Sequence, residues 1–185
     1  MSLALGRKER VSPVIEPATV KDFEAIADLN VRSYAEFESA LALGSWEVMQ
    51  KNLQNISERA ERSQFLVMRA NANIVGSVAY CPAGSGEPSL FKPDMASLLL
   101  LAVDPAHRGV GIAKALTLAC ISRAREDGAH SIGLFTSELM QSAQRLYRSV
   151  GFQLESELSM RHGVRYFRYV LPLNSGVSAQ QFVEG

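Results

Sequence analysis

A short segment of the chain has the residue types of an anion-binding loop. Arg108, Gly109 and Gly111 lie between the apolar run 98–103 and a helical pattern that begins at Ile112. The first N–H groups of a helix have no partner within the helix, and glycine lets an anion approach the backbone closely. Arginine and the positive end of the helix dipole both favour negative charge. The loop therefore predicts a site for a diphosphate.

Two common phosphate-binding motifs do not fit this loop. A P-loop needs Gly-Lys followed by Ser or Thr, whereas Gly111 is followed by Ile112 and Ala113. A dinucleotide-binding motif needs a third glycine where Lys114 stands, and no β-α-β unit surrounds the loop. Because two glycines alone are a weak signal, the interpretation depends on a longer stretch of sequence.

Two linked motifs resemble signatures of the GNAT superfamily of acyl-CoA-dependent N-acetyltransferases. The acyl-CoA-binding pattern of that family is Gln/Arg-x-x-Gly-x-Gly/Ala, and its three defined positions are matched by Arg108, Gly111 and Ala113. A second pattern, Ala-x-x-Leu-Tyr-x-x-x-Gly-Phe, is matched further along the chain by Ala143, Leu146, Tyr147, Gly151 and Phe152. One position departs from the family, because Met140 stands where many members carry asparagine.

The resemblance implies a mixed α/β fold of the GNAT type. Its central sheet would be mostly antiparallel, with about seven strands, a splayed parallel pair and about four flanking helices. Acetyl-CoA would be the co-substrate, its pantetheine arm lying between the strands that end at Val103 and Thr136, where backbone groups of Leu101 and Val103 polarise the thioester. The expected cofactor-binding residues are Leu101, Ala102, Val103, Arg108, Gly109, Val110, Gly111, Ile112, Ala113, Lys114 and Tyr147.

Tyr147 is the expected general acid, a role that the resemblance gives to it. A phenol with a pKa of about 10 can hydrogen-bond or protonate a leaving thiolate whose conjugate thiol has a pKa of about 8.5, and the transfer costs only about 2 kcal/mol. Helical spacing alone also fits an aromatic ring that packs beside Leu146 and Val150.

The general base is not assigned by position. An alkylamine is mostly protonated at pH 7, and the neutral form costs roughly 4.6 kcal/mol. Many GNAT members carry a glutamate on the strand before the glycine loop, but 95–101 holds no carboxylate. Glu36 and Glu38 are candidates for the base or for binding a cationic acceptor, although glutamates at a helix end are often simply solvated. His107 is expected to be a solvated loop residue.

The function predicted from these residues is transfer of an acetyl or other acyl group from coenzyme A to a primary amine, by direct attack in a ternary complex. The missing strand carboxylate leaves open an alternative, a non-catalytic acyl-CoA-binding sensor or regulatory domain. The sequence identifies neither the acceptor, which could be a metabolite, an antibiotic or a protein amine, nor whether two chains form a homodimer.

Composition sets limits on partners and location. Of 185 residues, 47% are hydrophobic, and 19 basic residues balance 19 acidic ones. No strong attraction to nucleic acid or to a membrane is therefore expected. Cys81 and Cys120 provide neither a disulfide framework nor a metal site, and both are expected to be buried thiols. Without a signal peptide or a run of roughly 18 apolar residues, the protein is predicted to be cytoplasmic.

Hydrophobic periodicity predicts the elements that position these residues. One domain is expected over 13–173, between loose tails at 1–12 and 174–185. The predicted order is strand, two helices, three strands, helix, strand, helix and two strands. The apolar run 98–103 is expected to be a central strand buried on both faces. The first helix carries Phe23 to Tyr34 with a cap at Thr19 and Asp22, and the second is expected to be continuous from Trp46 to Ala60.

Overall fold

The computed structural model describes residues 11–173, which form seven strands and five α-helices. The strands are β1 (Val11–Pro17), β2 (Gln64–Ala70), β3 (Asn73–Cys81), β4 (Met95–Val103), β5 (Ser131–Ser137), β6 (Gln153–Arg161) and β7 (Val164–Pro172). The helices are α1 (Phe23–Tyr34), α2 (Ser45–Gln54), α3 (Ile56–Ala60), α4 (Ile112–Glu126) and α5 (Gln141–Ser149). Short 3-10 turns are η1 (Val20–Asp22), η2 (Ala35–Ala40) and η3 (Pro105–His107).

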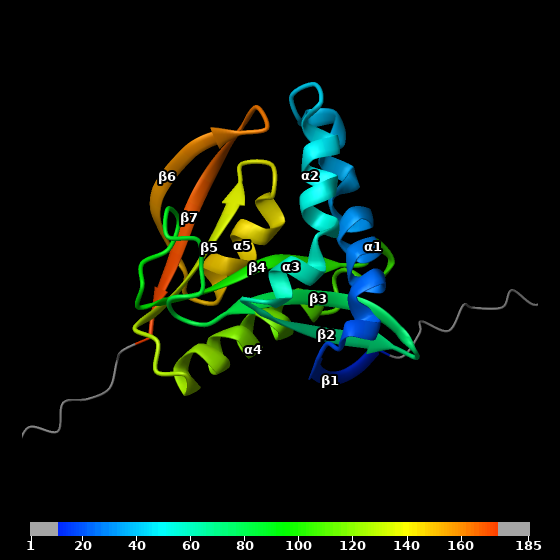
Figure 1. Ribbon diagram of the computed structural model, residues 1–185, viewed down its shortest axis with the longest axis horizontal. Coiled ribbons are helices and arrows are strands. Elements are labelled where there is room, and N and C mark those ends of the chain that lie inside the picture. Colours follow the sequence, from blue (N-terminus) through cyan, green and yellow to red (C-terminus); the bar gives the residue numbers. More distant parts are fainter. Residues whose placement is uncertain (1–10, 174–185) are drawn as a thin grey trace, which may run out of the picture.

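All seven strands belong to one sheet with helices on both faces (Figure 1). The strand order is β1-β2-β3-β4-β5-β7-β6. Every neighbouring pair is antiparallel except β4 and β5, which are parallel. The expected mixed α/β fold, with a mostly antiparallel sheet and one parallel pair, is thereby confirmed.

Alternation along the strands divides the core into two layers. On β2, Phe65 and Val67 pack in the layer that contains α1, whereas Leu66 and Met68 pack in the layer that contains α4. Successive side chains of a strand point to opposite faces, so both faces of this strand are apolar and both are covered. The helices α1 and α4 are therefore fixed on opposite sides of the sheet.

Two sequence-based boundaries need correction. The second predicted helix is divided at Asn55, whose ψ of 63° is not helical, so that α2 and α3 follow one another. Asn55 is the residue that precedes α3, and its side chain donates a hydrogen bond to the Glu58 carboxylate. Asparagine is less favourable in a helix interior than at such a helix start. The first strand begins at Val11, inside the segment expected to be a tail. Most of the expected tails, 1–10 and 174–185, lies outside the described residues.

The strand β4 separates from β5 halfway along its length. The two strands pair only from Met95 with Ser131 to Ser97 with Gly133. On the other side, Leu100 has a φ of 53° at a register shift against β3. Leu99 to Leu101 are only half buried, which corrects the prediction of a strand buried on both faces throughout. The splayed parallel pair implied by the resemblance is confirmed.

A glycine on β3 lets α4 lie close to the sheet. A Cβ atom added at Gly76 would lie 2.4 Å from Ile112 Cγ2 and 3.1 Å from Leu116 Cδ1. Both contacts are shorter than ordinary van der Waals contact, and a β-branched side chain such as Ile112 has little rotamer freedom in a helix. The first turn of α4, which carries the glycine loop, is thus positioned by direct packing on β3.

Both cysteines are buried and free, as predicted. Burial raises the pKa of the Cys120 thiol to about 12 and also raises that of Cys81, so neither thiol is ionised near neutral pH. Among the described residues, no helix is both long and apolar enough to cross a membrane.

Candidate functional site

A cavity of about 680 Å³ opens where β4, the glycine loop, α4 and α5 meet. Its volume lies within the about 300–1,000 Å³ that is typical of small-molecule and cofactor sites. Nearly all the residues predicted to bind the cofactor line it. These are Leu101, Ala102, Val103, Arg108, Gly109, Gly111, Ile112, Ala113, Lys114 and Tyr147. Val110 is the exception, because it is 55% exposed and does not line this cavity.

The loop before α4 leaves open space next to its backbone. Gly109 has a φ of 79° and Gly111 a φ of 91°, which are conformations that favour glycine. No protein atom lies within 4 Å of a Cβ added at either position. Close packing within the protein therefore does not require glycine at either position, and both positions leave room for a ligand in the cavity. An anion in this space would lie before the first turn of α4, where the backbone N–H groups lack partners within the helix.

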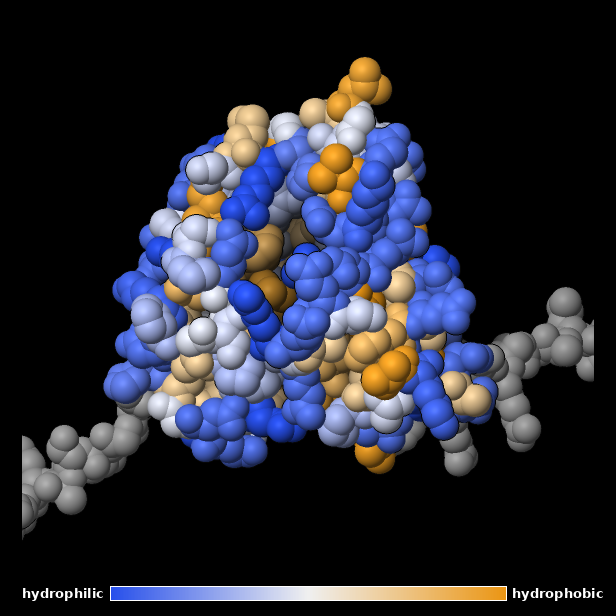
Figure 2. Space-filling model, in the orientation of Figure 1, coloured by the Kyte–Doolittle hydropathy of each residue, from blue (hydrophilic) through white to orange (hydrophobic). Residues whose placement is uncertain are grey.

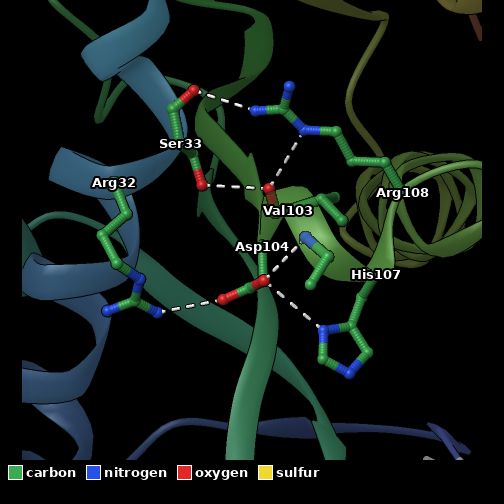
Figure 3. A network of polar contacts seen from close by, with 7 residues as sticks. Arg32, Ser33, Val103, Asp104, His107 and Arg108 are labelled. Atoms are coloured by element: carbon green, nitrogen blue, oxygen red, sulfur yellow. Dashed lines mark hydrogen bonds and ion pairs between the residues drawn. The ribbon is translucent and has the colours of Figure 1, made fainter. Parts of the chain in front are cut away.

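Arg108 connects the end of α1 to the end of β4 (Figure 3). It donates hydrogen bonds to the carbonyl oxygen of Ser33 at 3.0 Å and to that of Val103 at 3.4 Å. Its third contact is an ion pair with Glu36 at 2.6 Å. The hydroxyl of Ser33 also donates to the Val103 carbonyl, at 3.0 Å. The guanidinium group is therefore held at the cavity wall by three partners.

Asp104 shapes the turn between β4 and the glycine loop (Figure 3). Its carboxylate accepts hydrogen bonds from the Ala106 N–H at 2.9 Å and from Arg32 at 3.2 Å, and it lies 3.5 Å from His107 Nδ1. Partial burial opposes ionisation, but these three contacts outweigh it and lower the pKa of the carboxyl. His107 is thus largely buried against Asp104 and lines the cavity, whereas the sequence predicted a solvated residue.

Tyr147 projects from α5 to the floor of the cavity. Its side chain is 6% exposed and packs edge-on against Phe152 at a centroid distance of 5.9 Å. Its hydroxyl makes no hydrogen bond with any residue that the structure describes. Burial, with a smaller effect of the nearby Tyr34, raises the pKa of this phenol far above its ordinary value. The hydroxyl is therefore a hydrogen-bond donor that remains protonated, and it has no protein partner within 11–173.

A second cavity of about 170 Å³ lies beside the middle of β4, where it is lined by Leu98 to Leu101. It is lined from α2, α3, β4, β5 and the β6–β7 hairpin. Figure 2 shows the surface hollowed between α2 and the β5–β7 side of the sheet, with strongly hydrophilic side chains around the opening. Four residues line both cavities, namely Tyr34, Leu101, Met140 and Tyr147. The two cavities therefore meet at β4, beside the hydroxyl-bearing ring of Tyr147.

A comparison with protein-family models gives the family of this arrangement. The model described as "Acetyltransferase (GNAT) family" matches residues 23–152, which is more than half of the chain and includes the glycine loop and Tyr147. The chain belongs to the GNAT acetyltransferase family. The resemblance of its two sequence motifs to that family is thereby confirmed.

Curated relatives of this GNAT chain match it in part. N-acetyltransferase 8 of Mus musculus is 36% identical over 118 residues, which are 61% of this chain and 51% of the relative. The mycothiol acetyltransferase of Thermobispora bispora is 28% identical over 136 residues, which are 71% of this chain and 43% of the relative. The chain spans about half the length of the curated relatives that it matches.

Solved structures share the fold of this GNAT chain over most of its length. The ribosomal-protein-S18-alanine N-acetyltransferase of Escherichia coli has a TM-score of 0.66 at 18% identity, and the match covers 91% of this chain and 99% of that one. The structure of yncA from Salmonella typhimurium, solved with its cofactor acetyl-CoA, has a TM-score of 0.62 at 18% identity and covers 89% of this chain and 96% of its own. At such identities these matches show the fold alone.

The two glutamates predicted at the end of the first GNAT helix lie in different surroundings. Glu36 lines the larger cavity, where it is paired with Arg108. Glu38 is exposed on η2 and lines neither cavity. Their roles as base or acceptor ligand stay predictions, although the position of Glu36 beside the predicted diphosphate loop is closer to the cofactor side than to the acceptor side.

Tyr34 is a site residue that the sequence analysis did not single out. Its hydroxyl donates to the Leu101 carbonyl at 3.3 Å, and it lines both cavities. Burial and the neighbouring Tyr166 raise its pKa to about 12, against the opposing charge of Arg59. Its place on the last turn of α1 was visible as helical spacing, but only the fold shows that this turn faces β4.

Gly111→Ala is predicted to weaken coenzyme A binding at least about tenfold, because the new methyl group occupies the space open to the diphosphate. Gly128→Ala is the matched control, since Gly128 also has a positive φ, 73°, and open space around it, but ends α4 far from the loop. Both variants are expected to lose similar stability from backbone strain of about 1–2 kcal/mol. Calorimetric titration with coenzyme A, beside thermal melts, measures the difference. Equal affinity in the two variants would contradict the assignment of the loop.

Proposed function

We propose that this chain is an N-acetyltransferase that moves an acetyl group from acetyl-CoA to a primary amine by direct attack in a ternary complex. The observation that carries this proposal is the meeting of two cavities at one stretch of β4. One cavity has the glycine loop and the other opens separately to solvent. Such an arrangement lets donor and acceptor be bound together, with their reactive groups near Leu101 and Tyr147.

The backbone of β4 supports the placement of a pantetheine arm. Beyond Ser97, β4 no longer pairs with β5, and Leu100 and Leu101 have no pairing partner on β3 within the described register. Unpaired strand edges readily bond an extended, amide-bearing ligand. The carbonyls of Leu101 and Val103 already accept hydrogen bonds from Tyr34, Ser33 and Arg108, and each carbonyl oxygen has two lone pairs. In this proposal the bulge at Leu100 keeps those backbone groups oriented for the thioester.

Acetyl-CoA supplies an activated carbonyl carbon, and the protein supplies orientation and a partner for sulfur. The amine nitrogen forms the new C–N bond, the C–S bond breaks, and the amine loses the proton that leaves a neutral amide. Tyr147 donates its hydrogen bond to the sulfur as negative charge develops there. Because burial raises the pKa of Tyr147, complete proton transfer is favourable only when the same burial also makes the thiolate more basic.

The amine must also lose a proton to a group near the second cavity or to water. None of the described residues that line the second cavity is a carboxylate. This observation favours the alternative function, an acyl-CoA-binding sensor that does not turn over. The proposed enzyme instead binds the acceptor as a neutral amine, or releases its proton to water through the opening of the cavity. A turnover experiment distinguishes the two functions.

Release of free thiol from acetyl-CoA is predicted to depend on an added amine. With the purified full chain and a panel of primary amines, at least one amine is expected to raise thiol release above the rate without acceptor, and mass spectrometry should find the acetylated amine. Coenzyme A binding is measured on the same sample by calorimetry. Tight cofactor binding without amine-dependent release across the panel would favour the sensor over the enzyme.

Tyr147→Phe is predicted to lower kcat by about 10²- to 10⁴-fold while coenzyme A affinity changes by no more than a few fold. The ring and its contact with Phe152 are retained, so the loss reports the hydroxyl and not a cavity in the core. Tyr80→Phe is a control, because Tyr80 is also buried, its hydroxyl bonds Asp127, and it lines neither cavity. A wild-type kcat for Tyr147→Phe, under conditions in which chemistry limits turnover, would show that the tyrosine is structural.

A further inference from the structure

The second cavity is lined by positive charge that no carboxylate balances. This charge comes from Arg59 on α3 and from Arg161 at the end of β6, and His162 in the turn that follows also lines the cavity. The remaining titratable side chains in its lining are Tyr34, Tyr147 and Tyr166. No aspartate or glutamate of the described chain lines this cavity. The acceptor side is thus positively charged, although the whole chain has a formal net charge of zero.

The two arginines of this cavity differ from most other arginines near the sheet. Arg32, Arg69, Arg108, Arg165 and Arg168 all have a carboxylate partner within 4.0 Å. Among residues 11–173, the side chain of Arg59 donates only one long hydrogen bond, of 3.4 Å, to the Asn52 carbonyl. Arg161 lies over the Phe135 ring, 5.8 Å from its centroid, and has no ion pair within the described part of the chain. Both guanidinium groups therefore have donors left for a ligand.

Other observations show that this charge acts within the cavity. Burial raises the pKa of Tyr166, and the charge of Arg161 opposes this rise. The charge of Arg59 likewise opposes the rise in the pKa of Tyr34.

A buried hydroxyl in the same cavity has no partner within residues 11–173. Thr136 is 3% exposed and lines the cavity, and its hydroxyl makes no hydrogen bond with any of the described residues. A buried hydroxyl without a partner is unfavourable, and a polar ligand would satisfy it.

We infer that the acceptor is a small amine that also carries a carboxylate, with Arg59 and Arg161 as the groups that bind the carboxylate. Guanidinium groups bind carboxylates with paired hydrogen bonds and remain charged at all physiological pH values. The amine would then point toward Leu101, Met140 and Tyr147, where the two cavities meet. This inference rests on the proposed transferase function, because it names the substrate class of the same site.

The size and lining of the cavity limit the acceptor further. Its volume of about 170 Å³ is below the about 300–1,000 Å³ of typical drug-sized sites. Its walls also include Met49, Leu53, Leu98 and the rings of Phe135 and Tyr166. The acceptor is therefore of amino-acid size, with an apolar portion that packs against these walls.

The same positive charge favours the reactive form of the amine. A positively charged neighbour lowers the pKa of an ammonium group, because it disfavours a second positive charge nearby. An acceptor whose carboxylate is bound by Arg59 and Arg161 would keep its amine close to these charges. The carboxylate supplies affinity, while the arginines make the neutral amine more accessible. This arrangement offers a physical reason why a carboxylate base is absent from the lining.

The experiment compares apolar amino acids with their carboxamides, which have the same side chain and lack the negative charge. Wild-type kcat/KM is expected to favour the acids by about tenfold or more, because only the acids form charge-assisted hydrogen bonds with the guanidinium groups. Arg161→Gln and Arg59→Gln are expected to raise KM for the acids about tenfold and to leave coenzyme A affinity unchanged. Arg165→Gln is the matched control, since Arg165 lies on the same β6–β7 hairpin as Arg161, is paired with Glu138 just after β5, and lines neither cavity.

A binding measurement keeps the substrate class separate from turnover. N-acetylated amino acids, with coenzyme A present, are expected to bind wild-type protein more tightly than their carboxamides, and Arg161→Gln should abolish the difference. Turnover or binding that is equal for acids and carboxamides, or stronger for carboxamides, would overturn the inference and leave the transferase function intact. Absence of any amine-dependent turnover, with the acids still bound preferentially, would instead contradict the transferase function and support the carboxylate site.

Discussion

The separation of β4 from β5 after Ser97 and Gly133 is the constraint on which the rest of the site depends. A parallel pair that stays hydrogen-bonded to its end leaves no room for a ligand between its strands. Here the pairing stops, so the second half of β4 has cavities beside it that are lined from both sheet faces. Leu100 also has a positive φ, which leucine rarely adopts. Such backbone strain persists only where the surrounding structure enforces it.

The helices on either side hold this opening in place. The packing of α4 on Gly76 sets the glycine loop at one end of β4. On the other face, α1 is tied to β4 by Ser33 and Tyr34, whose hydroxyls donate to the Val103 and Leu101 carbonyls. Charge is then distributed between the two cavities. In the larger one, Arg108 is already balanced by Glu36, whereas in the smaller one Arg59 and Arg161 have no carboxylate partner within 11–173. The two cavities are thus suited to different ligands.

Motifs that depend on local backbone geometry could be predicted from the sequence. Arg108, Gly109 and Gly111 lie within one loop, so the apolar periodicity on both sides predicted the strand and the helix that flank it. The anion site was predicted from these residues together with the longer motif, and it stays a prediction. The break at Asn55 was not predicted, because helical spacing continues through it and only the non-helical backbone of this one residue separates the two helices. The second cavity was not predicted either. Arg59, Thr136 and Arg161 are far apart in sequence, and only the sheet order brings α3, β5 and the β6–β7 hairpin together.

The central claim, that a coenzyme A thioester binds along the free half of β4 with its diphosphate at the glycine loop, can be tested directly by nuclear magnetic resonance. Backbone amide shifts of the ¹⁵N-labelled chain would be followed during titration with coenzyme A. The largest changes are expected at residues 99–103 and 109–113, with β1 and β2 almost unaffected. Saturable binding whose shift changes spare both of these segments would contradict the claim.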